Sequence, residues 1–294
     1  MLASTAFTAD PTRSCARSSR AHCEPRGSLL ERRRPMRILL TGASRGIGRA
    51  IAERLARPGA RLALCASAPS AELDETVAVA RKAGAEVHGL SADLSDPASP
   101  TALVEQAFCA LGGVDAVVSN AGIARPGLLA EMAEDDWNRI FSVNVRSPWL
   151  LARAAYKHLT ASKGAFIAVA SMSGVEPYAG VGAYSPSKAA LIMLVRQLAL
   201  EWAGDGVRVN AVSPGLFLSA MTAPIYADAE KKAAREALVP MHRIGDPVHD
   251  IAGLVEFLIS DDATYITGQN ILVDGGLLGS IQKHIAGRPK SGSL

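Results

Sequence analysis

The sequence predicts a single α/β domain over residues 36–294, with a doubly wound parallel sheet and helices on both of its faces. Three observations support this prediction: short apolar runs alternate with helical patterns, a glycine-rich turn follows the first run, and no linker or internal repeat interrupts the alternation. Strands separated by helices form right-handed crossovers, which make a sheet parallel and cover it on both sides.

The expected strands are short apolar runs bounded by turn residues. In chain order they are Arg37–Leu40, Arg61–Cys65, Glu86–Leu90, Val114–Ser119, Ala165–Ala170, Val207–Val212 and Asn270–Val273.

The expected helical segments are longer and repeat their apolar residues every three or four positions. In chain order they are Gly48–Leu55, Leu73–Lys82, Thr101–Leu111, Trp137–Leu159, Tyr184–Trp202 and Asp246–Ile259.

The composition supports a globular chain with a sizeable core. Of 294 residues, 49% are hydrophobic and 20% are charged. No apolar run approaches the roughly 18 residues of a membrane span, and four cysteines are too few for a disulfide scaffold. Cys65 and Cys109 lie in apolar contexts, which predicts small buried thiols in a reducing, cytoplasmic location.

The basic charge of the chain lies in residues 1–35. This leader holds seven arginines and three acidic residues, a net charge of +4, so residues 36–294 carry −1 of the total of +3. It lacks helical or strand periodicity and is expected to be disordered. The alternatives are an organelle transit peptide or a misassigned start, with Met36 as the true first residue; a secretory signal would need a continuous apolar stretch. The domain itself therefore gives no support to nucleic-acid binding.

A glycine-rich turn, Thr41–Gly48, joins the first expected strand to the first expected helix. Gly42 permits a tight turn, Gly46 lets the backbone approach a pyrophosphate, and Gly48 lets helix and sheet pack closely. The helix N-terminus then offers N–H groups and a positive dipole end to the anion. This arrangement is typical of a Rossmann domain and predicts a bound dinucleotide. The expected contacts are Gly42, Ser44, Arg45, Gly46, Ile47 and Gly48.

With this glycine spacing, and with further motifs in the same order, the sequence resembles the short-chain dehydrogenase/reductase family over about residues 36–276. The motifs are Asp93-Leu94, Asn120-Ala121-Gly122, Asn144, Ser171, Tyr184-Ser185-Pro186-Ser187-Lys188, Pro214-Gly215 and Val273-Asp274-Gly275-Gly276. Two departures are small: Ser119 stands where the family usually has Asn, and Pro186 falls in the first turn of a helix, where it is tolerated.

The second expected strand ends without a carboxylate, and Glu72 is the first acid beyond it. An acid about 20 residues after the turn usually holds the ribose 2′-hydroxyl of NAD, and it would repel a 2′-phosphate. Its absence, with Arg45 inside the turn, favours NADP(H) over NAD(H). The resemblance implies the same preference from Arg45 and Ser67.

The resemblance implies further cofactor contacts. Asp93 and Leu94 would flank the adenine, although Asp93 could equally be a turn or cap residue. Asn120 would lie near the adenosine ribose, and Ser219 would contact the nicotinamide amide or a phosphate. The other expected contacts are Ala121, Gly122, Tyr184, Lys188, Pro214 and Gly215, and no metal is expected.

Four residues are expected to be catalytic. Tyr184 and Lys188 lie one helical turn apart on one face. The ammonium and an oxidised nicotinamide would both lower the tyrosine pKa from about 10, which makes Tyr184 the general acid for reduction or the base for oxidation. The resemblance implies that Ser171 orients the substrate oxygen and that Asn144 holds a water linking Lys188 to solvent. Ser173 is a rival for the serine role, but its spacing to Tyr184 does not match the family.

The leading hypothesis is an NADP-dependent oxidoreductase that reduces a ketone, resembling 3-oxoacyl-[acyl-carrier-protein] reductases, so that a 3-oxoacyl thioester is one candidate substrate. The first alternative is an NAD(P)-dependent secondary-alcohol or sugar dehydrogenase working oxidatively. The second is a non-catalytic dinucleotide-sensing protein, which the presence of both Tyr184 and Lys188 disfavours. The resemblance also implies a homotetramer that pairs Trp137–Leu159 and Tyr184–Trp202 across a dimer axis.

Overall fold

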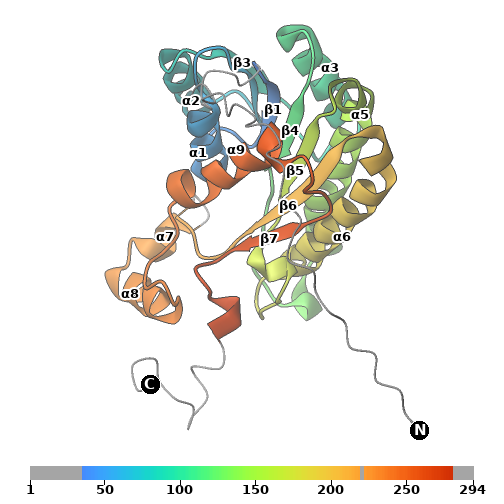
Figure 1. Ribbon diagram of the computed structural model, residues 1–294. Helices are drawn as coiled ribbons and strands as arrows, with labels where there is room; N and C mark the ends of the chain where they lie inside the picture. Colours follow the sequence, from blue (N-terminus) through green and yellow to red (C-terminus); the bar gives the residue numbers. More distant parts are fainter. Residues whose placement is uncertain (1–34, 219–221, 281–294) are drawn as a thin grey trace, which may run out of the picture. The chain divides into compact units, whose positions relative to one another are not determined.

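The computed structural model describes residues 35–218 and 222–280, and these residues form the α/β fold that the sequence predicts. Seven strands make one sheet in the order β3-β2-β1-β4-β5-β6-β7, and all neighbouring strands are parallel (Figure 1). The chain winds from β1 outward to β3, returns to β4 beside β1, and winds outward to β7. This doubly wound order reverses direction between β1 and β4.

The strands match the expected runs to within two residues at each end. They are β1 (Arg37–Thr41), β2 (Arg61–Ala66), β3 (Glu86–Ser91), β4 (Ala116–Ser119), β5 (Ala165–Val169), β6 (Arg208–Pro214) and β7 (Asn270–Val273).

Each expected helical segment overlaps at least one α-helix. The α-helices are α1 (Gly46–Leu55), α2 (Ala71–Lys82), α3 (Ser99–Leu111), α4 (Glu134–Phe141), α5 (Ser147–Ser162), α6 (Tyr184–Trp202), α7 (Ala223–Tyr226), α8 (Ala229–Leu238) and α9 (Gly253–Ile259). Two expected helical segments contain a wider π-helical turn, Ser142–Arg146 before α5 and Pro247–Ala252 before α9. Within the described residues, none of these helices is both long and apolar enough to cross a bilayer.

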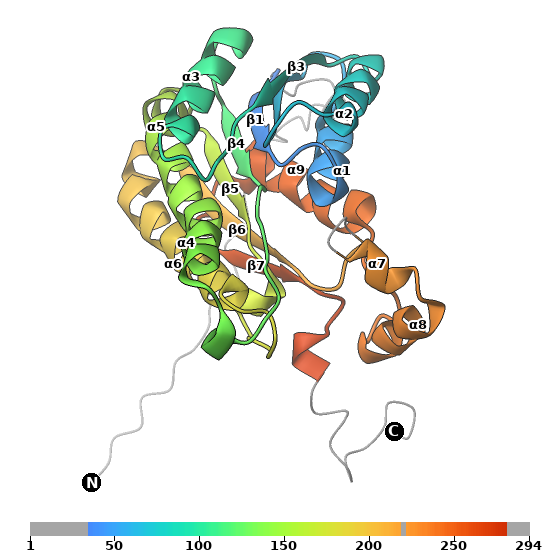
Figure 2. The ribbon, with the colours of Figure 1, turned by 180° about the vertical axis from the view of Figure 1, so that it is seen from behind.

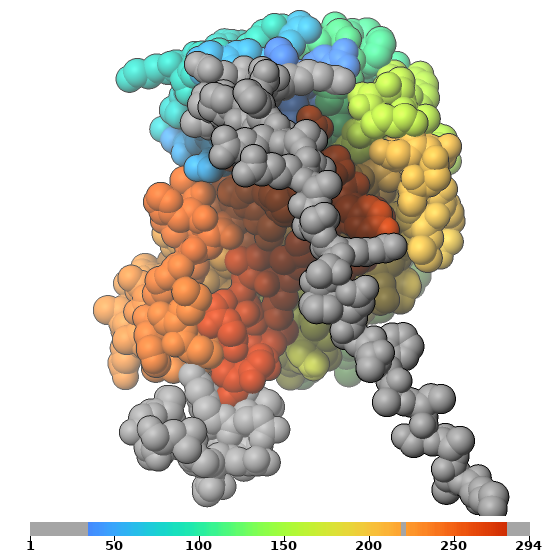
Figure 3. All heavy atoms as spheres, in the orientation of Figure 1, coloured from blue at the N-terminus to red at the C-terminus, as the bar shows by residue number. Residues whose placement is uncertain are grey.

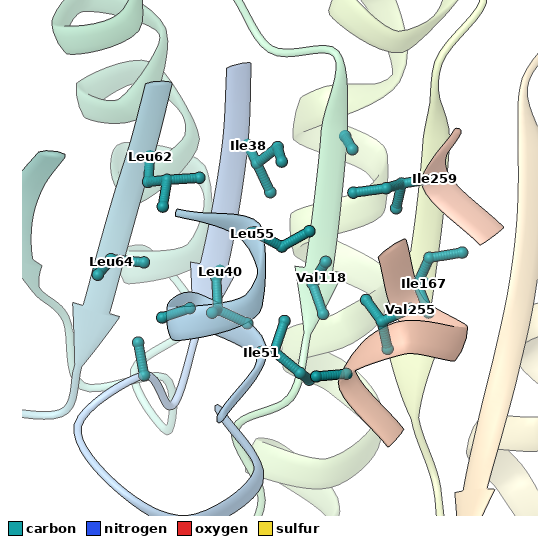
Figure 4. Close-up of a cluster of buried hydrophobic side chains, with 14 of the residues drawn as sticks. Ile38, Leu40, Ile51, Leu55, Leu62, Leu64, Val118, Ile167, Val255 and Ile259 are labelled. Carbon is teal, nitrogen blue, oxygen red and sulfur yellow. The ribbon is translucent and has the colours of Figure 1, made fainter. Parts of the chain in front are cut away.

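Helices cover both faces of the sheet, as expected. α1, α2 and α9 lie on one face, and α3, α5 and α6 lie on the other (Figures 1 and 2). The side chains of successive strand residues point to opposite faces of the sheet. Ile38 and Leu40 of β1 pack toward α1 and α9, whereas Leu39 packs toward α3 and α5. Figure 4 shows the first of these clusters, in which Ile51 and Val255 meet over the strands. Each fully buried aliphatic side chain of this kind contributes about 1.5–3 kcal/mol.

The two cysteines of the domain differ in exposure. Cys65 is buried in β2, as expected, but the expectation of a buried Cys109 is wrong, because Cys109 is exposed. Helix α3 buries Leu103, Ala107 and Leu111 toward the sheet. A position two residues beyond Ala107 is turned by about 200° around the helix axis, so Cys109 faces outward despite its apolar neighbours in the sequence.

The segment from Leu216 to Arg243 leaves the sheet after β6 and carries α7 and α8. Its ends meet, because the backbone N–H of Gly245 donates to the carbonyl oxygen of Leu216 at 2.9 Å. Asp228 caps α8 through the N–H groups of Glu230 and Lys231, but none of the residues of α8 is buried. Figure 3 shows these atoms in orange, on the face that is turned to the viewer.

Two expectations fall outside the described residues. The leader prediction concerns residues 1–35, of which the structure describes only Pro35. The expected cofactor contact of Ser219 lies in the stretch 219–221, which is likewise not described.

Candidate active site

The candidate site lies at the carboxyl edge of the sheet, where the strand order reverses. β1 runs into the glycine turn at Gly42, and its neighbour β4 runs into Asn120. β5 pairs with β4 and leads to Ser171 at the same edge. Ligands of open parallel sheets bind at this edge, beside the switch point.

The glycine turn has the geometry that a pyrophosphate requires. Gly42 and Gly46 have φ angles of +66° and +58°, in the left-handed region that favours glycine. A Cβ on Gly48 would lie 2.0 Å from the carbonyl oxygen of Gly42. Arg45 is the N-cap of α1, and its side chain makes no capping hydrogen bond to the first-turn amides. The close packing and the uncapped helix N-terminus therefore fit a dinucleotide, which Ser44 and Ile47 would also contact.

Asn120 clamps the turn to β4. Its Nδ2 atom donates to the carbonyl oxygens of Thr41 and Gly42 at 3.1 and 3.0 Å. The hydroxyl of Thr41 accepts from the N–H groups of Asn120 and Ala121, both at 3.1 Å. Sequence reasoning gives Thr41 no role, although it begins the glycine motif. The contact of Asn120 with the adenosine ribose stays a prediction.

The residues expected around the adenosine follow β2 and β3. Ser67 and Asp93 are exposed, whereas Leu94 is buried in the core. Asp93 Oδ1 accepts from the backbone N–H and the hydroxyl of Ser95 at 2.9 and 2.7 Å. These two bonds hold the pKa of Asp93 below its usual range. Asp93 is thus a turn residue, and its exposed position is compatible with the cofactor role as well.

Ser171, Tyr184 and Lys188 come together after β5. The Ser171 hydroxyl acts on the phenol of Tyr184 and lowers its pKa. Lys188 Nζ lies 5.7 Å from the centre of the Tyr184 ring and donates to the carbonyl oxygen of Val169 at 2.9 Å. Lys188 is buried, whereas Tyr184 is partly exposed. The rival Ser173 is buried behind Ser171, with the two hydroxyl oxygens 2.9 Å apart.

The pKa of Tyr184 lies above its usual value of 10, and the expectation of a lowered pKa is wrong for the chain by itself. Burial raises this pKa, and the hydrogen bond with Ser171 offsets only part of the rise. Lys188 is a weaker source of positive charge than expected, because burial lowers its own pKa to about 8. The pKa of Tyr184 depends on how the rest of the chain packs around the phenol. The sequence spacing of Tyr184 and Lys188 contains no information on that packing.

Asn144 is fully buried in the π-helical turn between α4 and α5. Its Oδ1 accepts from the N–H of Ile123 at 2.9 Å, and its Nδ2 donates to the carbonyl oxygen of Ile123 at 2.9 Å and to Ser187 Oγ at 3.0 Å. Pro148 has no N–H and cannot donate to the Asn144 carbonyl oxygen, as residue i+4 of an α-helix would. The wider turn at this point is a common feature of functional sites.

Gly122 lies between Lys188 and Asn144. A Cβ on Gly122 would lie 3.3 Å from Lys188 Nζ and 3.4 Å from Asn144 Oδ1. Ser187 adds a link that sequence reasoning misses, since its hydroxyl donates to the carbonyl oxygen of Tyr184 at 2.7 Å. The sequence signal for it is only its place next to the lysine in the Tyr-to-Lys motif.

Pro214 and Gly215 lie at the carboxyl end of β6. The N–H of Gly215 donates to the carbonyl oxygen of Val273 at 2.8 Å. A Cβ on Gly215 would lie 2.6 Å from the Cβ of Asp274. This glycine therefore lets the ends of β6 and β7 meet at the edge where the cofactor is expected.

Lys188 is expected to make folding stability depend on pH. Its pKa is about 8 in the folded chain against an ordinary value of 10.5, so the unfolded chain binds more protons between these values. The free energy of unfolding should therefore rise from about pH 8 to about pH 10.5. Urea unfolding at about pH 7.5 and about pH 9.5 should show a larger rise for the wild type than for Lys188→Met. Equal rises in the two proteins would contradict the buried amine.

A doubly wound parallel sheet, a glycine turn at its switch point and a Ser–Tyr–Lys cluster on the same edge define a dinucleotide-dependent oxidoreductase. The family model described as enoyl-(acyl carrier protein) reductase matches residues 42–278. 3-Oxoacyl-[acyl-carrier-protein] reductase FabG of Escherichia coli K12 is 38% identical over 240 residues, which cover 81% of this chain and 96% of that protein. The chain belongs to the short-chain dehydrogenase/reductase family, and it is an NAD(P)-dependent enzyme that acts on CH–OH or C=O groups.

Other relatives are named for different substrates. 3beta-Hydroxysteroid dehydrogenase 1 of Eggerthella lenta is 35% identical over 242 residues, which cover 82% of this chain and 92% of that protein. The structure of L-sorbose reductase from Gluconobacter frateurii, complexed with NADPH and L-sorbose, has a TM-score of 0.77 and 32% identity, and the match covers 83% of this chain and 97% of that chain. Similarity alone therefore does not choose a substrate.

Proposed function

We propose that this enzyme uses NADPH to reduce a ketone to a secondary alcohol. The observation that carries the proposal is the cluster of Ser171, Tyr184 and Lys188 at the sheet edge that also holds the glycine turn. Because Tyr184 is partly exposed and Ser171 acts on its hydroxyl, a carbonyl oxygen could contact both groups. The nicotinamide supplies the hydride when it is bound.

Tyr184 acts as the general acid. Its raised pKa keeps the phenol protonated near neutral pH, and this is the form that reduction needs. Lys188, when protonated, stabilises the phenolate that remains after proton transfer. Ser171 orients and polarises the carbonyl oxygen.

Asn144 connects Lys188 to solvent. Its side chain lies across Gly122 from the ammonium group and is held by Ile123 and Ser187. We assign it the water that returns protons to Lys188. Within the described residues, no group of three or more His, Cys, Asp and Glu side chains could hold a metal ion.

The preference for NADPH rests on Arg45, exposed at the turn, and on Ser67 at the position where an acid would select NAD. L-Sorbose reductase, which is similar in structure, is described with NADPH. Fluorescence titration should give a lower dissociation constant for NADPH than for NADH. Equal or reversed affinities would contradict the roles of Arg45 and Ser67.

A panel of substrates tests the reaction. Loss of NADPH absorbance should occur with at least one ketone among a 3-oxoacyl thioester, a keto sugar and a 3-ketosteroid. An enoyl thioester belongs in the panel because of the description of the matching family model. Turnover of the enoyl thioester alone would contradict carbonyl reduction. Cofactor binding without turnover of any of these compounds, or of the matching alcohols, would favour the dinucleotide-sensing alternative.

We also propose a homotetramer. Helices α5 and α6 lie side by side on one face of the sheet (Figures 1 and 2). They expose Trp149, Met193 and Leu200, and Leu200 is 80% exposed. Large apolar side chains exposed on neighbouring helices are typical of a protein interface. Light scattering should report four times the mass of the chain, and a monomer would contradict the proposal.

A further inference from the structure

An acidic face of α2 lies against the phosphate turn. Glu72, Glu75 and Thr76 share one side of the helix because they are three and four residues apart. The hydroxyl oxygen of Thr76 lies 3.3 Å from the carbonyl oxygen of Ser44 and 2.9 Å from that of Glu72, the nearer acceptor for its one proton. This face of α2 is therefore directed at the loop expected to hold the cofactor phosphates.

One acid on this face already has a cationic partner. Glu75 accepts two hydrogen bonds from Arg49 of α1, at 2.9 and 3.1 Å, and Arg49 also donates to Glu53 at 2.8 Å. Arg49 is thus engaged by two carboxylates. Both helices are crossovers on the same face of the sheet and run in the same direction. Arg45 precedes Arg49 by four residues as the N-cap of α1, and Glu72 precedes Glu75 by three residues on α2, so both residues lie at the ends of these helices that are nearer the phosphate turn.

Glu72 holds a fixed negative charge at this point. Its carboxylate accepts from its own backbone N–H and from the Ser70 hydroxyl, and these bonds, together with the positive charge of Arg45, hold its pKa below the usual range. Ser70 also caps α2, because its hydroxyl oxygen accepts from the N–H of Leu73 at 3.2 Å. The carboxylate is thus ionised at neutral pH and placed at the positive end of the helix dipole.

We propose that Glu72 sets how strongly the enzyme distinguishes NADPH from NADH, by competing with the 2′-phosphate of NADPH for Arg45. The proposal rests on the cofactor site proposed above. A carboxylate beside Arg45 cancels part of its positive charge and repels a phosphate. NADH carries a neutral hydroxyl at this position, so the same carboxylate affects it much less.

Glu72→Gln tests the proposal, because the amide keeps the size of the side chain and removes its charge. The dissociation constant of NADPH should fall by about two- to fivefold, in keeping with exposed charge pairs and helix dipoles, and that of NADH should change little. Glu75→Gln is the matched control, since it removes the same charge from the same helix face but from the partner of Arg49. Both constants come from fluorescence titration without substrate.

The two proposals fail in different ways. A ratio of NADH to NADPH dissociation constants that does not rise in Glu72→Gln, or that rises equally in Glu75→Gln, would overturn the role of Glu72. If the wild-type enzyme binds NADH more tightly than NADPH, the proposed cofactor preference is wrong. A rise in the ratio of NADH to NADPH dissociation constants in Glu72→Gln would still support the role of Glu72. In an Arg45→Ala background the effect of Glu72→Gln should shrink, and an undiminished effect would show that Glu72 does not act through Arg45.

Discussion

Replacing Tyr184 by phenylalanine is expected to abolish turnover and to leave cofactor binding intact. Phenylalanine keeps the ring beside Lys188 but lacks the hydroxyl that meets Ser171, so no acid remains to protonate the substrate oxygen. A positioned general acid contributes about 10²- to 10⁴-fold, and kcat should fall by a factor in this range. Steady-state kinetics with NADPH and a ketone measure the loss, and fluorescence titration measures NADPH binding.

Tyr156→Phe is the matched control for this experiment. Tyr156 lies on α5, and its hydroxyl donates to Asp205 at 2.6 Å. Its loss should lower the free energy of unfolding only slightly and leave kcat unchanged. If Tyr184→Phe keeps wild-type turnover, Tyr184 is not the acid. If both variants lose activity to the same extent, the loss comes from the fold instead.

The fold could be predicted because its signal is repeated along the chain. Each strand is a short apolar run, and each crossover helix shows its own buried stripe, so an error of two residues at the ends of β4 or β6 does not change the topology. Cys109 shows the limit of this reasoning. Its neighbours in the sequence are apolar, but the direction of one side chain depends on its angle around the helix axis.

The candidate site could be predicted as a set of residues but not as an electrostatic environment. The spacing of Tyr184 and Lys188 places them on one helix face, and the structure agrees. Their pKa values depend on burial by segments far away in the sequence, which raises the first and lowers the second. For the same reason the sequence shows Glu72 only as the first acid after β2. Its position beside Arg45 follows from the packing of α2 against the turn.

Gly48→Ala is expected to weaken both the fold and the cofactor site. The new methyl group would lie 2.0 Å from the Gly42 carbonyl oxygen and 2.5 Å from Asn120 Nδ2, so it would push the turn away from its clamp. Overpacking of this kind costs about 1–3 kcal/mol of stability. Loss of one charge-assisted hydrogen bond to the pyrophosphate costs about 1.5–3 kcal/mol, so NADPH affinity should fall by about 10- to 100-fold.

Gly253→Ala separates this clash from the general effect of a glycine-to-alanine change. Gly253 begins α9, and a Cβ there would meet no atom within 4 Å among the described residues. Alanine is the better helix former, so this variant should match or exceed the wild type in urea unfolding by up to about 1 kcal/mol and should bind NADPH normally. Helix propensity alone would raise the stability of both variants. A stable Gly48→Ala protein with normal NADPH affinity would therefore show that the turn can move without loss of the phosphate contacts, and would contradict both expected effects of the close approach at Gly48.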